Sequence, residues 1–279
     1  MRLTYTTREP QTTGVRSRRA GSQAEVAVAL ALAACISACA ASGASSDGGG
    51  DAGTTSPAPC PASAVVCDDF EDGNLDGWTR LVTSGTLAID TVHASSGSSA
   101  LSINIPANQR GGFIERSGAP LFPLPGKVMW GRVMVYFDST SDGHTDVVRG
   151  APVGGGTPWY NVGEQHGDIL LNYYDGSAAD CWARPSPGRP VALATWTCWE
   201  WSFDGNTNEM QLWIDGELSR RVSATGDGCI SGQNTTWTAP DFGALRIGAY
   251  IAEPRDTVAQ MWLDDIAVGT QERIGCPTP

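Results

Sequence analysis

Two acidic motifs of similar design lie near opposite ends of the chain, and both could supply carboxylate ligands to a cation. The first is Cys67-Asp-Asp-Phe-Glu-Asp-Gly73, and the second is Trp262-Leu-Asp-Asp-Ile266 within an apolar, strand-like run. A β-sandwich that pairs its first and last strands would bring these carboxylates together. A hard cation that prefers oxygen ligands, such as Ca²⁺, suits such a site. The simpler interpretation is that the acidic residues are solvated at strand ends and turns.

A second group of residues has the types needed to cleave an acidic polysaccharide by β-elimination. Such a lyase neutralises the substrate carboxylate, removes the neighbouring C5 proton and protonates the leaving oxygen. The segment 159–174 offers Gln165 and His166 beside several tyrosines, and Arg132 lies on a predicted neighbouring strand. His166 could equally be an exposed loop histidine, and Arg132 a sheet arginine paired with Glu200.

Aromatic side chains on the predicted strands could bind sugar rings by stacking. The candidates for carbohydrate binding are Trp130, Tyr136, Trp159, Tyr160 and Tyr173. The alternative is that most of the ten tryptophans lie in the core. The sequence therefore leaves three functions open: binding of a polysaccharide, cleavage of a uronic-acid polymer, and a structural or adhesive role without a glycan ligand.

Short β-strands must position all of these residues, because strand-like runs recur between Gly, Asp, Asn and Pro, and no stretch keeps a helical period for long. In the segment 127–138, strict alternation predicts that Met129, Val133, Val135 and Phe137 face the core. The opposite face of this strand mixes aromatic and cationic side chains. This pattern predicts an all-β fold.

The clearest hairpin joins the segments 198–203 and 209–214 through a polar turn. Trp199, Trp201 and Phe203 fall on one face of its first strand, and the second strand repeats the alternation. An Asp-Gly pair at residues 215–216 then favours another tight turn. Hairpins of this kind predict an antiparallel β-sandwich.

Residues 1–39 have the pattern of a lipoprotein signal peptide, with arginines before an apolar run that is too short to span a membrane stably. Cys39 ends a lipobox-like motif and is the expected lipidation site, with Cys35 as the alternative. Residues 40–59 read as a flexible Gly/Ser-rich tether, and residues 60–279 as the globular domain. We therefore expect an exported protein, anchored by lipid at the bacterial outer membrane or cell surface, or secreted.

The chain is strongly acidic, with a formal net charge of −12 at pH 7. Removal of residues 1–38 takes away five arginines and two glutamates and would move the charge to −15. Such a field disfavours nucleic acid as a partner and should also repel polyanionic glycans unless arginines form a local basic patch. We expect a monomer.

Six cysteines follow the lipobox, an even number that predicts three disulfides in an oxidising compartment. Their spacing lacks a Cys-x-x-Cys pair, and the three histidines are scattered, which argues against a zinc site.

Several segments in order resemble the fungal cellulose-induced secreted protein family (Cip-like core domain). They are Asp68-Asp-Phe-Glu71, Ser96-Gly-Ser98, Trp196-Thr-Cys-Trp-Glu200, Leu212-Trp-Ile-Asp-Gly216, Trp262-Leu-Asp-Asp-Ile266 and Arg273-Ile-Gly-Cys276. The resemblance spans about Cys67 to Cys276 and implies a concanavalin A-like jelly roll, similar to glucuronan lyases and more distantly to alginate lyases.

The resemblance also implies a structural calcium ion held by Glu71, Ser96, Ser99 and Asp264, although Ser99 stands where the family has asparagine. It further implies a disulfide between Cys198 and Cys276. Proximity in the sequence then favours Cys60 with Cys67, which leaves Cys181 with Cys229.

Gln165 corresponds to a glutamine in the cleft proposed for that family, but the histidine and arginine that precede it there are Trp159 and Asn161 here. The electropositive part of the cleft is therefore expected to be missing, which favours binding over lyase chemistry.

Overall fold

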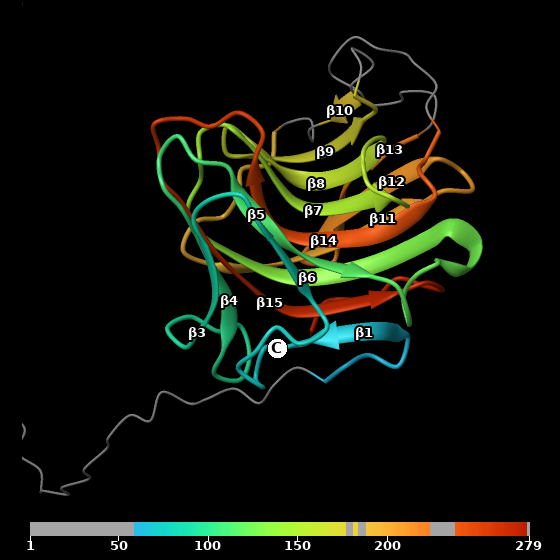
Figure 1. The fold of residues 1–279 in the computed structure, drawn as a ribbon, viewed down its shortest axis with the longest axis horizontal. Helices are drawn as coiled ribbons and strands as arrows, with labels where there is room; N and C mark the ends of the chain where they lie inside the picture. The colour runs from blue at the N-terminus through green and yellow to red at the C-terminus, as the bar shows by residue number, and fades with distance from the viewer. Residues whose placement is uncertain (1–58, 177–180, 184–187, 224–237, 278–279) are drawn as a thin grey trace, which may run out of the picture. The chain divides into compact units, whose positions relative to one another are not determined.

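Two antiparallel β-sheets pack face to face and enclose the hydrophobic core (Figure 1). The computed structural model describes residues 59–176, 181–183, 188–223 and 238–277, and for residues 181–183 the backbone alone. The predicted signal peptide, Cys35, Cys39 and the predicted tether up to residue 58 lie outside the described residues. Within the described ranges, no helix has the length and apolar character needed to cross a membrane.

The eight-stranded sheet has the order β13-β12-β11-β6-β15-β4-β3, with β1 paired to β15. Its strands are β1 (Ala64–Asp68), β3 (Thr86–Asp90), β4 (Ala100–Ile105), β6 (Val128–Ser139), β11 (Trp196–Asp204), β12 (Glu209–Ile214), β13 (Glu217–Val222) and β15 (Ala259–Gly269). A single 3₁₀ turn, η1 (Pro125–Lys127), precedes β6.

The seven-stranded sheet has the order β10-β9-β8-β7-β14-β5-β2. Its strands are β2 (Thr79–Val82), β5 (Gly111–Ser117), β7 (His144–Pro152), β8 (Trp159–Gln165), β9 (Asp168–Tyr174), β10 (Cys181–Ala183) and β14 (Phe242–Ile251). Together the two layers form the antiparallel β-sandwich that the sequence predicts.

The core between the sheets follows the alternation of β6 and of the β11–β12 hairpin. Met129, Val133, Val135 and Phe137 of β6 are buried in the core, as predicted. The three aromatic side chains of β11, Trp199, Trp201 and Phe203, are also buried there. Each buried side chain of this size contributes roughly 2–3 kcal/mol. Gly131 of β6 is required because a Cβ at this position would lie 2.1 Å from the ring of Trp201.

The first and last strands pair with each other, as expected from the two acidic motifs. β1 runs antiparallel to β15, with Cys67 opposite Ala267 and Asp68 opposite Ile266 (Figure 1). The disulfides Cys60–Cys67 and Cys198–Cys276 are both present. The remaining expected pair, Cys181–Cys229, lies outside the residues whose side chains are described.

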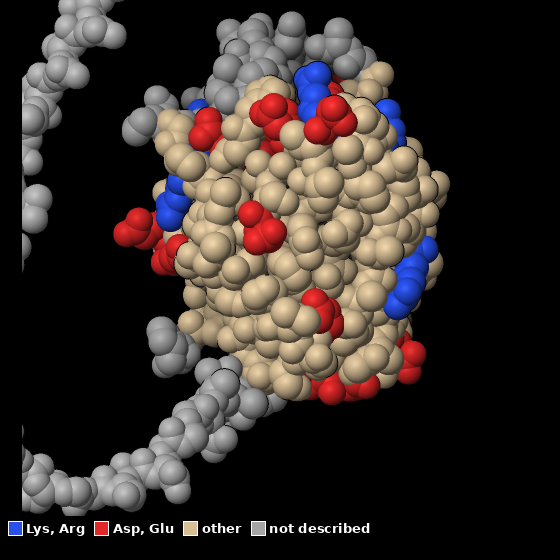
Figure 2. Space-filling model, turned by 90° about the vertical axis from the view of Figure 1, so that its left-hand side faces the viewer, with Lys and Arg blue, Asp and Glu red and all other residues tan. Residues whose placement is uncertain are grey.

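Acidic side chains predominate on one side of the molecule. Figure 2 shows a face on which Asp and Glu residues are scattered among uncharged ones, while Lys and Arg residues lie mostly towards its edges. This distribution agrees with the strongly negative net charge of −12.

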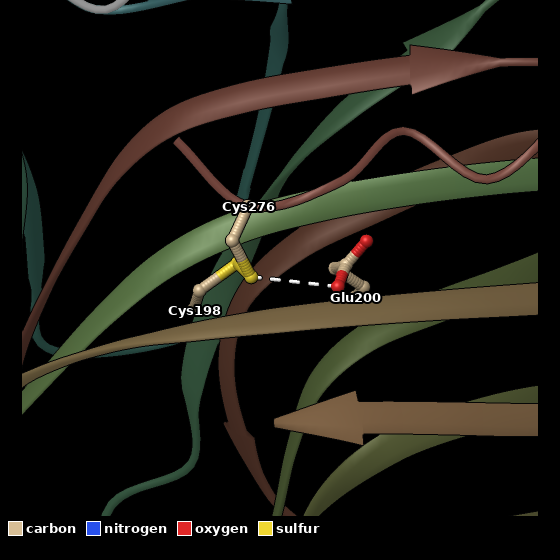
Figure 3. A group of neighbouring side chains, drawn as sticks. All are labelled: Cys198, Glu200 and Cys276. Atoms are coloured by element: carbon tan, nitrogen blue, oxygen red, sulfur yellow. Dashed lines mark hydrogen bonds between the residues drawn. A yellow bond between two sulfur atoms is a disulfide. The ribbon is translucent and has the colours of Figure 1, made fainter. Parts of the chain in front are cut away.

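The C-terminal segment is held to β11 by an ion pair between the buried Glu200 and the exposed Arg273, beside a disulfide. The fully buried carboxylate of Glu200 accepts hydrogen bonds from Nε of Arg273 at 3.0 Å, from a second nitrogen of that guanidinium, and from the main-chain N–H of Gly275 at 2.8 Å. Sγ of Cys276 lies 3.4 Å from the same carboxylate (Figure 3).

This group is not a metal site. Within the described part of the chain, it is the one group of at least three His, Cys, Asp and Glu side chains whose ligand atoms lie within 4.8 Å of one another. The disulfide uses both sulfurs (Figure 3), so the group fastens the chain end rather than binding an ion.

We expect Arg273→Ala to lower the free energy of unfolding by about 2–4 kcal/mol, because it leaves the Glu200 carboxylate buried without its cation. Urea denaturation of the oxidised protein measures this difference. The matched control is Arg255→Ala, which removes an exposed pair with Glu253 at 3.1 Å and should cost less than about 1 kcal/mol. Equal losses for both variants would contradict a clamping role for Arg273.

Candidate functional site

A cavity of about 370 Å³ opens on the outer face of the seven-stranded sheet. β7 contributes His144, Asp146 and Arg149 to it, and β8 and β9 contribute the neighbouring amides Asn161 and Asn172. The sequence did not indicate the three β7 residues, which bring an arginine and a histidine to the cavity although Trp159 and Asn161 occupy the two positions where these residue types were expected to be missing.

A β-bulge in β7 explains how these residues reach one face. Asp146 and Arg149 are three positions apart, so a regular strand would place them on opposite faces. The register of β7 against β8 shifts between Asp146 and Val148, which adds one residue to β7. Val147 and Val148 consequently both lie in the core, and Asp146 and Arg149 both line the cavity. In the sequence, the bulge corresponds only to two adjacent valines, where strict alternation would place a single apolar residue.

The polar side chains of the cavity form a connected network around Asp146. Its Oδ1 lies 3.2 Å from Nε2 of His144, and its Oδ2 accepts a short hydrogen bond from the Arg149 guanidinium. Nε of Arg149 also donates to Oδ1 of Asn161 at 3.0 Å. Burial alone would raise the pKa of Asp146, but the contacts with His144 and Arg149 outweigh it and hold that pKa below its ordinary value. Asp146 is therefore a charged partner of Arg149.

Two amide atoms at the cavity have no hydrogen-bond partner among the described residues. They are Nδ2 of Asn161 and Oδ1 of Asn172, and the two side chains are 1% and 4% exposed. The two residues are direct neighbours across β8 and β9. A buried polar atom without a partner costs about 1–3 kcal/mol. A ligand that donates to one amide and accepts from the other would remove this cost.

Aromatic rings line the same cavity. Trp159 and Tyr174 are paired across β8 and β9, with ring centroids 4.8 Å apart. Tyr250 of β14 also lines the cavity. Cζ of Arg149 lies 4.3 Å from the ring centroid of Trp159 and 5.3 Å from that of Tyr250. Such rings offer flat apolar surfaces beside polar groups.

The predicted carbohydrate-binding residues do not form one surface. Trp159 lines the cavity, but Tyr160 and Tyr173 point into the core and are 0% and 5% exposed. Their assignment to a sugar-binding face is wrong, since neighbours along a strand face opposite ways. Trp130 and Tyr136 lie on β6 in the other sheet.

The predicted catalytic residues are not brought together either. Gln165 ends β8 on the same side as Trp159 and is paired in register with His144. His166 lies in the turn after β8, and its Nδ1 is 3.0 Å from the carbonyl oxygen of Asp142. Arg132 belongs to β6 and donates to main-chain oxygens, including that of Gly275 at 3.1 Å. Arg132 therefore secures the C-terminal segment and is no part of the cavity.

The four predicted metal ligands lie within or beside the turn at residues 95–99. Oε1 of Glu71 accepts hydrogen bonds from the main-chain N–H groups of Ser98 and Ser99 at 2.8 and 2.7 Å. Oδ2 of Asp264 accepts from Ser95 and Ser96 at 2.8 and 3.3 Å. Both carboxylates thus bind opposite ends of one turn.

Gly97 allows this approach. It has a φ of +61°, and a Cβ at this position would lie 2.4 Å from the carboxylate carbon of Glu71. Only glycine combines the left-handed backbone with so close a carboxylate.

A second β-bulge brings another carboxylate to this turn. The register of β15 against β6 shifts between Asp264 and Ala267, and Asp265 has a φ of +48°. The hydroxyl of Ser96 donates to Oδ1 of Asp265 at 2.7 Å, whereas the buried Oδ2 has no hydrogen-bond partner among the described residues. Asp265 is 3% exposed, so the interpretation of it as a solvated strand-end residue is wrong.

The electrostatics of this cluster differ from those of the cavity. Burial, together with the charge of Asp265, raises the pKa of Asp264 to about 8. Burial also raises the pKa of Asp265. The charge of Arg132 lowers the pKa of Asp265 but does not outweigh the effect of burial. A bound cation would favour the charged form of both carboxylates.

No protein-family model and no curated protein matches this sequence. Among solved structures, the chain is similar to "Cellulose induced protein, Cip1", with a TM-score of 0.61 and 18% identity, over 76% of this chain and 99% of that chain. It is also similar to a sialidase, with a TM-score of 0.52 and 11% identity, over 76% of this chain and 19% of that chain.

A third similar structure belongs to botulinum neurotoxin type C, whose cell entry is described as dependent on interaction with two ganglioside molecules. Its TM-score is 0.51 and its identity 8%, over 75% of this chain and 48% of that chain. Sequence identities this low support a similarity of fold and nothing further. Together with the two antiparallel sheets, these likenesses show that the described domain is a jelly-roll β-sandwich.

Proposed function

We propose that this domain binds a polysaccharide chain in the cavity of the seven-stranded sheet. The observation that carries the proposal is the pair of buried, unpartnered amide atoms of Asn161 and Asn172 beside the aromatic wall. Sugars combine apolar ring faces, which stack on Trp159, Tyr174 and Tyr250, with hydroxyl groups that bond to amides. Sites of this size usually combine apolar walls with a few placed polar groups.

The similar folds support the proposal at the level of ligand class. One is named for induction by cellulose, one is a sialidase, and one is described as interacting with gangliosides. The competing proposal of an adhesive module without a glycan ligand does not explain the two buried amide atoms.

A lyase that cleaves a uronic-acid polymer is a second candidate function. The contact between His144 and Asp146 favours it, because a carboxylate that orients a histidine is a common arrangement for a general base. Tyr174 and Tyr250 line the same cavity and could protonate a leaving oxygen. Arg149, the residue suited to a substrate carboxylate, is already bonded to Asp146.

A calcium ion between the terminal strands is a further part of the proposal. Glu71, Asp264 and the Ser96 and Ser99 oxygens would hold it, and Asp265 offers an additional buried oxygen. These oxygen donors suit Ca²⁺. The ion would add positive charge beside the buried carboxylates of Asp264 and Asp265 and would join the 95–99 turn to β15.

Lipid attachment at Cys39, or at Cys35, would place the domain at a bacterial surface, where polysaccharide is accessible. The mass of the first residue of the mature protein decides between the two cysteines and an ordinary, unmodified signal-peptide cleavage site.

We expect Trp159→Ala to weaken glycan binding by at least about fivefold, since stacking on an aromatic ring contributes about 1 kcal/mol. Titration calorimetry with soluble oligosaccharides measures the change. Trp130→Ala, in the other sheet, is the control and should leave the affinity unchanged. Retention of full affinity by Trp159→Ala would remove the cavity from consideration.

The lyase is tested by the ultraviolet absorbance of the unsaturated uronic product with glucuronan, alginate and pectin. Binding alone predicts no rise in absorbance. A rise that His144→Ala lowers at least about 100-fold, while His166→Ala leaves it intact, would establish the lyase and contradict a purely binding role.

We expect a calcium chelator to lower the melting temperature and added calcium to restore it, because the ion binds the folded state. Glu71→Gln should lose this response, whereas the exposed neighbour variant Asp72→Asn should keep it. An unchanged melting curve would argue against the ion.

The stability of the chelated protein should also depend on pH. In the folded, chelated protein the pKa of Asp264 is about 8, above its ordinary value near 3.8. The contribution of Asp264 to stability should therefore be fully present below about pH 4 and be lost as the pH rises through about 8. Calcium binds the charged form, so it should remove this loss.

A further inference from the structure

We propose that the cavity selects neutral, hydroxyl-rich glycans over polyuronates, and that Asp146 is the residue that sets this preference. The inference rests on the proposed glycan binding and adds the class of glycan and the device that selects it. It follows from the charges, contacts and free hydrogen-bonding atoms of the cavity.

The charged side chains around the cavity already contact other protein groups. Arg110, Arg149, Asp146 and Glu253 line it, two cations and two carboxylates. Glu253 forms an exposed pair with Arg255 at 3.1 Å. Arg110 donates to main-chain carbonyls, including that of Ala252 at 2.8 Å. A polyuronate, with one carboxylate per sugar, would therefore have to compete with these contacts for either arginine of the cavity.

Arg149 is the cation best placed to meet a substrate carboxylate, yet it already has a carboxylate partner in Asp146. Its guanidinium bonds to Asp146 and Asn161 and lies between the rings of Trp159 and Tyr250. The side chain is 8% exposed, and that of Asp146 is 3% exposed. A substrate carboxylate would have to displace Asp146 and leave a buried charge with only His144 beside it, which is costly.

The two unpartnered amide atoms require a ligand that both donates and accepts hydrogen bonds. The bond from Arg149 to Oδ1 of Asn161 fixes that amide, so its Nδ2 is a donor directed to a ligand. Oδ1 of Asn172 is an acceptor. A hydroxyl group can serve both atoms, whereas an ionised carboxylate only accepts and would oppose Asn172. The net charge of −12 adds to this discrimination.

The first experiment compares matched ligands on the full-length protein. Each pair consists of a neutral β-1,4-linked oligosaccharide and the polyuronate oligosaccharide of the same backbone, in glucan, mannan and galactan series. Calorimetry should show at least about tenfold tighter binding of the neutral member of the pair that binds. Equal or tighter binding of the polyuronate would overturn the inference and leave the proposed function standing. Binding of no member of any pair would contradict both.

The second experiment removes the compensating charge. Asp146→Asn frees Arg149 for a substrate carboxylate, so affinity for the polyuronate should rise at least about tenfold and weaken with added salt. Asp76→Asn is the control, because Asp76 is exposed, does not line the cavity, and its loss changes the net charge equally. A folded Asp146→Asn protein with unchanged preference would overturn the role of Asp146. If this variant does not fold, the wild-type comparison still decides the selectivity.

Discussion

The packing of the two sheets against each other determines which side chains of each regular strand face the core and which face outwards. A strand that contributes to the core gives alternate residues to it, and the residues between them must face outwards. Both candidate sites occur where a β-bulge interrupts this rule. One bulge brings Asp146 and Arg149 to the same face of β7, and the other brings Asp264 and Asp265 to the same turn. The sites depend on these two local insertions into otherwise regular strands.

The two bulges lead to opposite electrostatic outcomes. In β7 the carboxylate of Asp146 has Arg149 and His144 beside it, and its charged form is favoured. In β15 two adjacent carboxylates are buried with main-chain amides and a serine hydroxyl, and their protonated forms are favoured. In the first arrangement the carboxylate has a cation as its partner within the protein, and two neutral amide atoms remain without a hydrogen-bond partner among the described residues. In the second, burial outweighs the nearby charge of Arg132, and a further cation would favour the charged carboxylates.

The sequence predicts the sandwich, the core faces of β6 and the β11–β12 hairpin, and the pairing of the terminal strands, because these follow from strict alternation and from motif position. It does not predict the cavity. Periodicity cannot reveal the bulge that places Asp146 beside Arg149, nor decide which of the adjacent aromatics Trp159 and Tyr160 faces outwards. It also cannot assign a strand to a sheet, which is why Arg132 was expected near Gln165 although the two lie in different sheets.

The disulfide between Cys60 and Cys67 determines how the domain responds to mechanical force. Tension on the chain before Cys60 passes through the sulfur–sulfur bond directly into Cys67. The segment between the two cysteines, which includes the first residues of β1 and their pairing with the end of β15, then carries no load. Force applied from the N-terminal side therefore acts first on the pairing of Asp68 in β1 with Ile266 in β15.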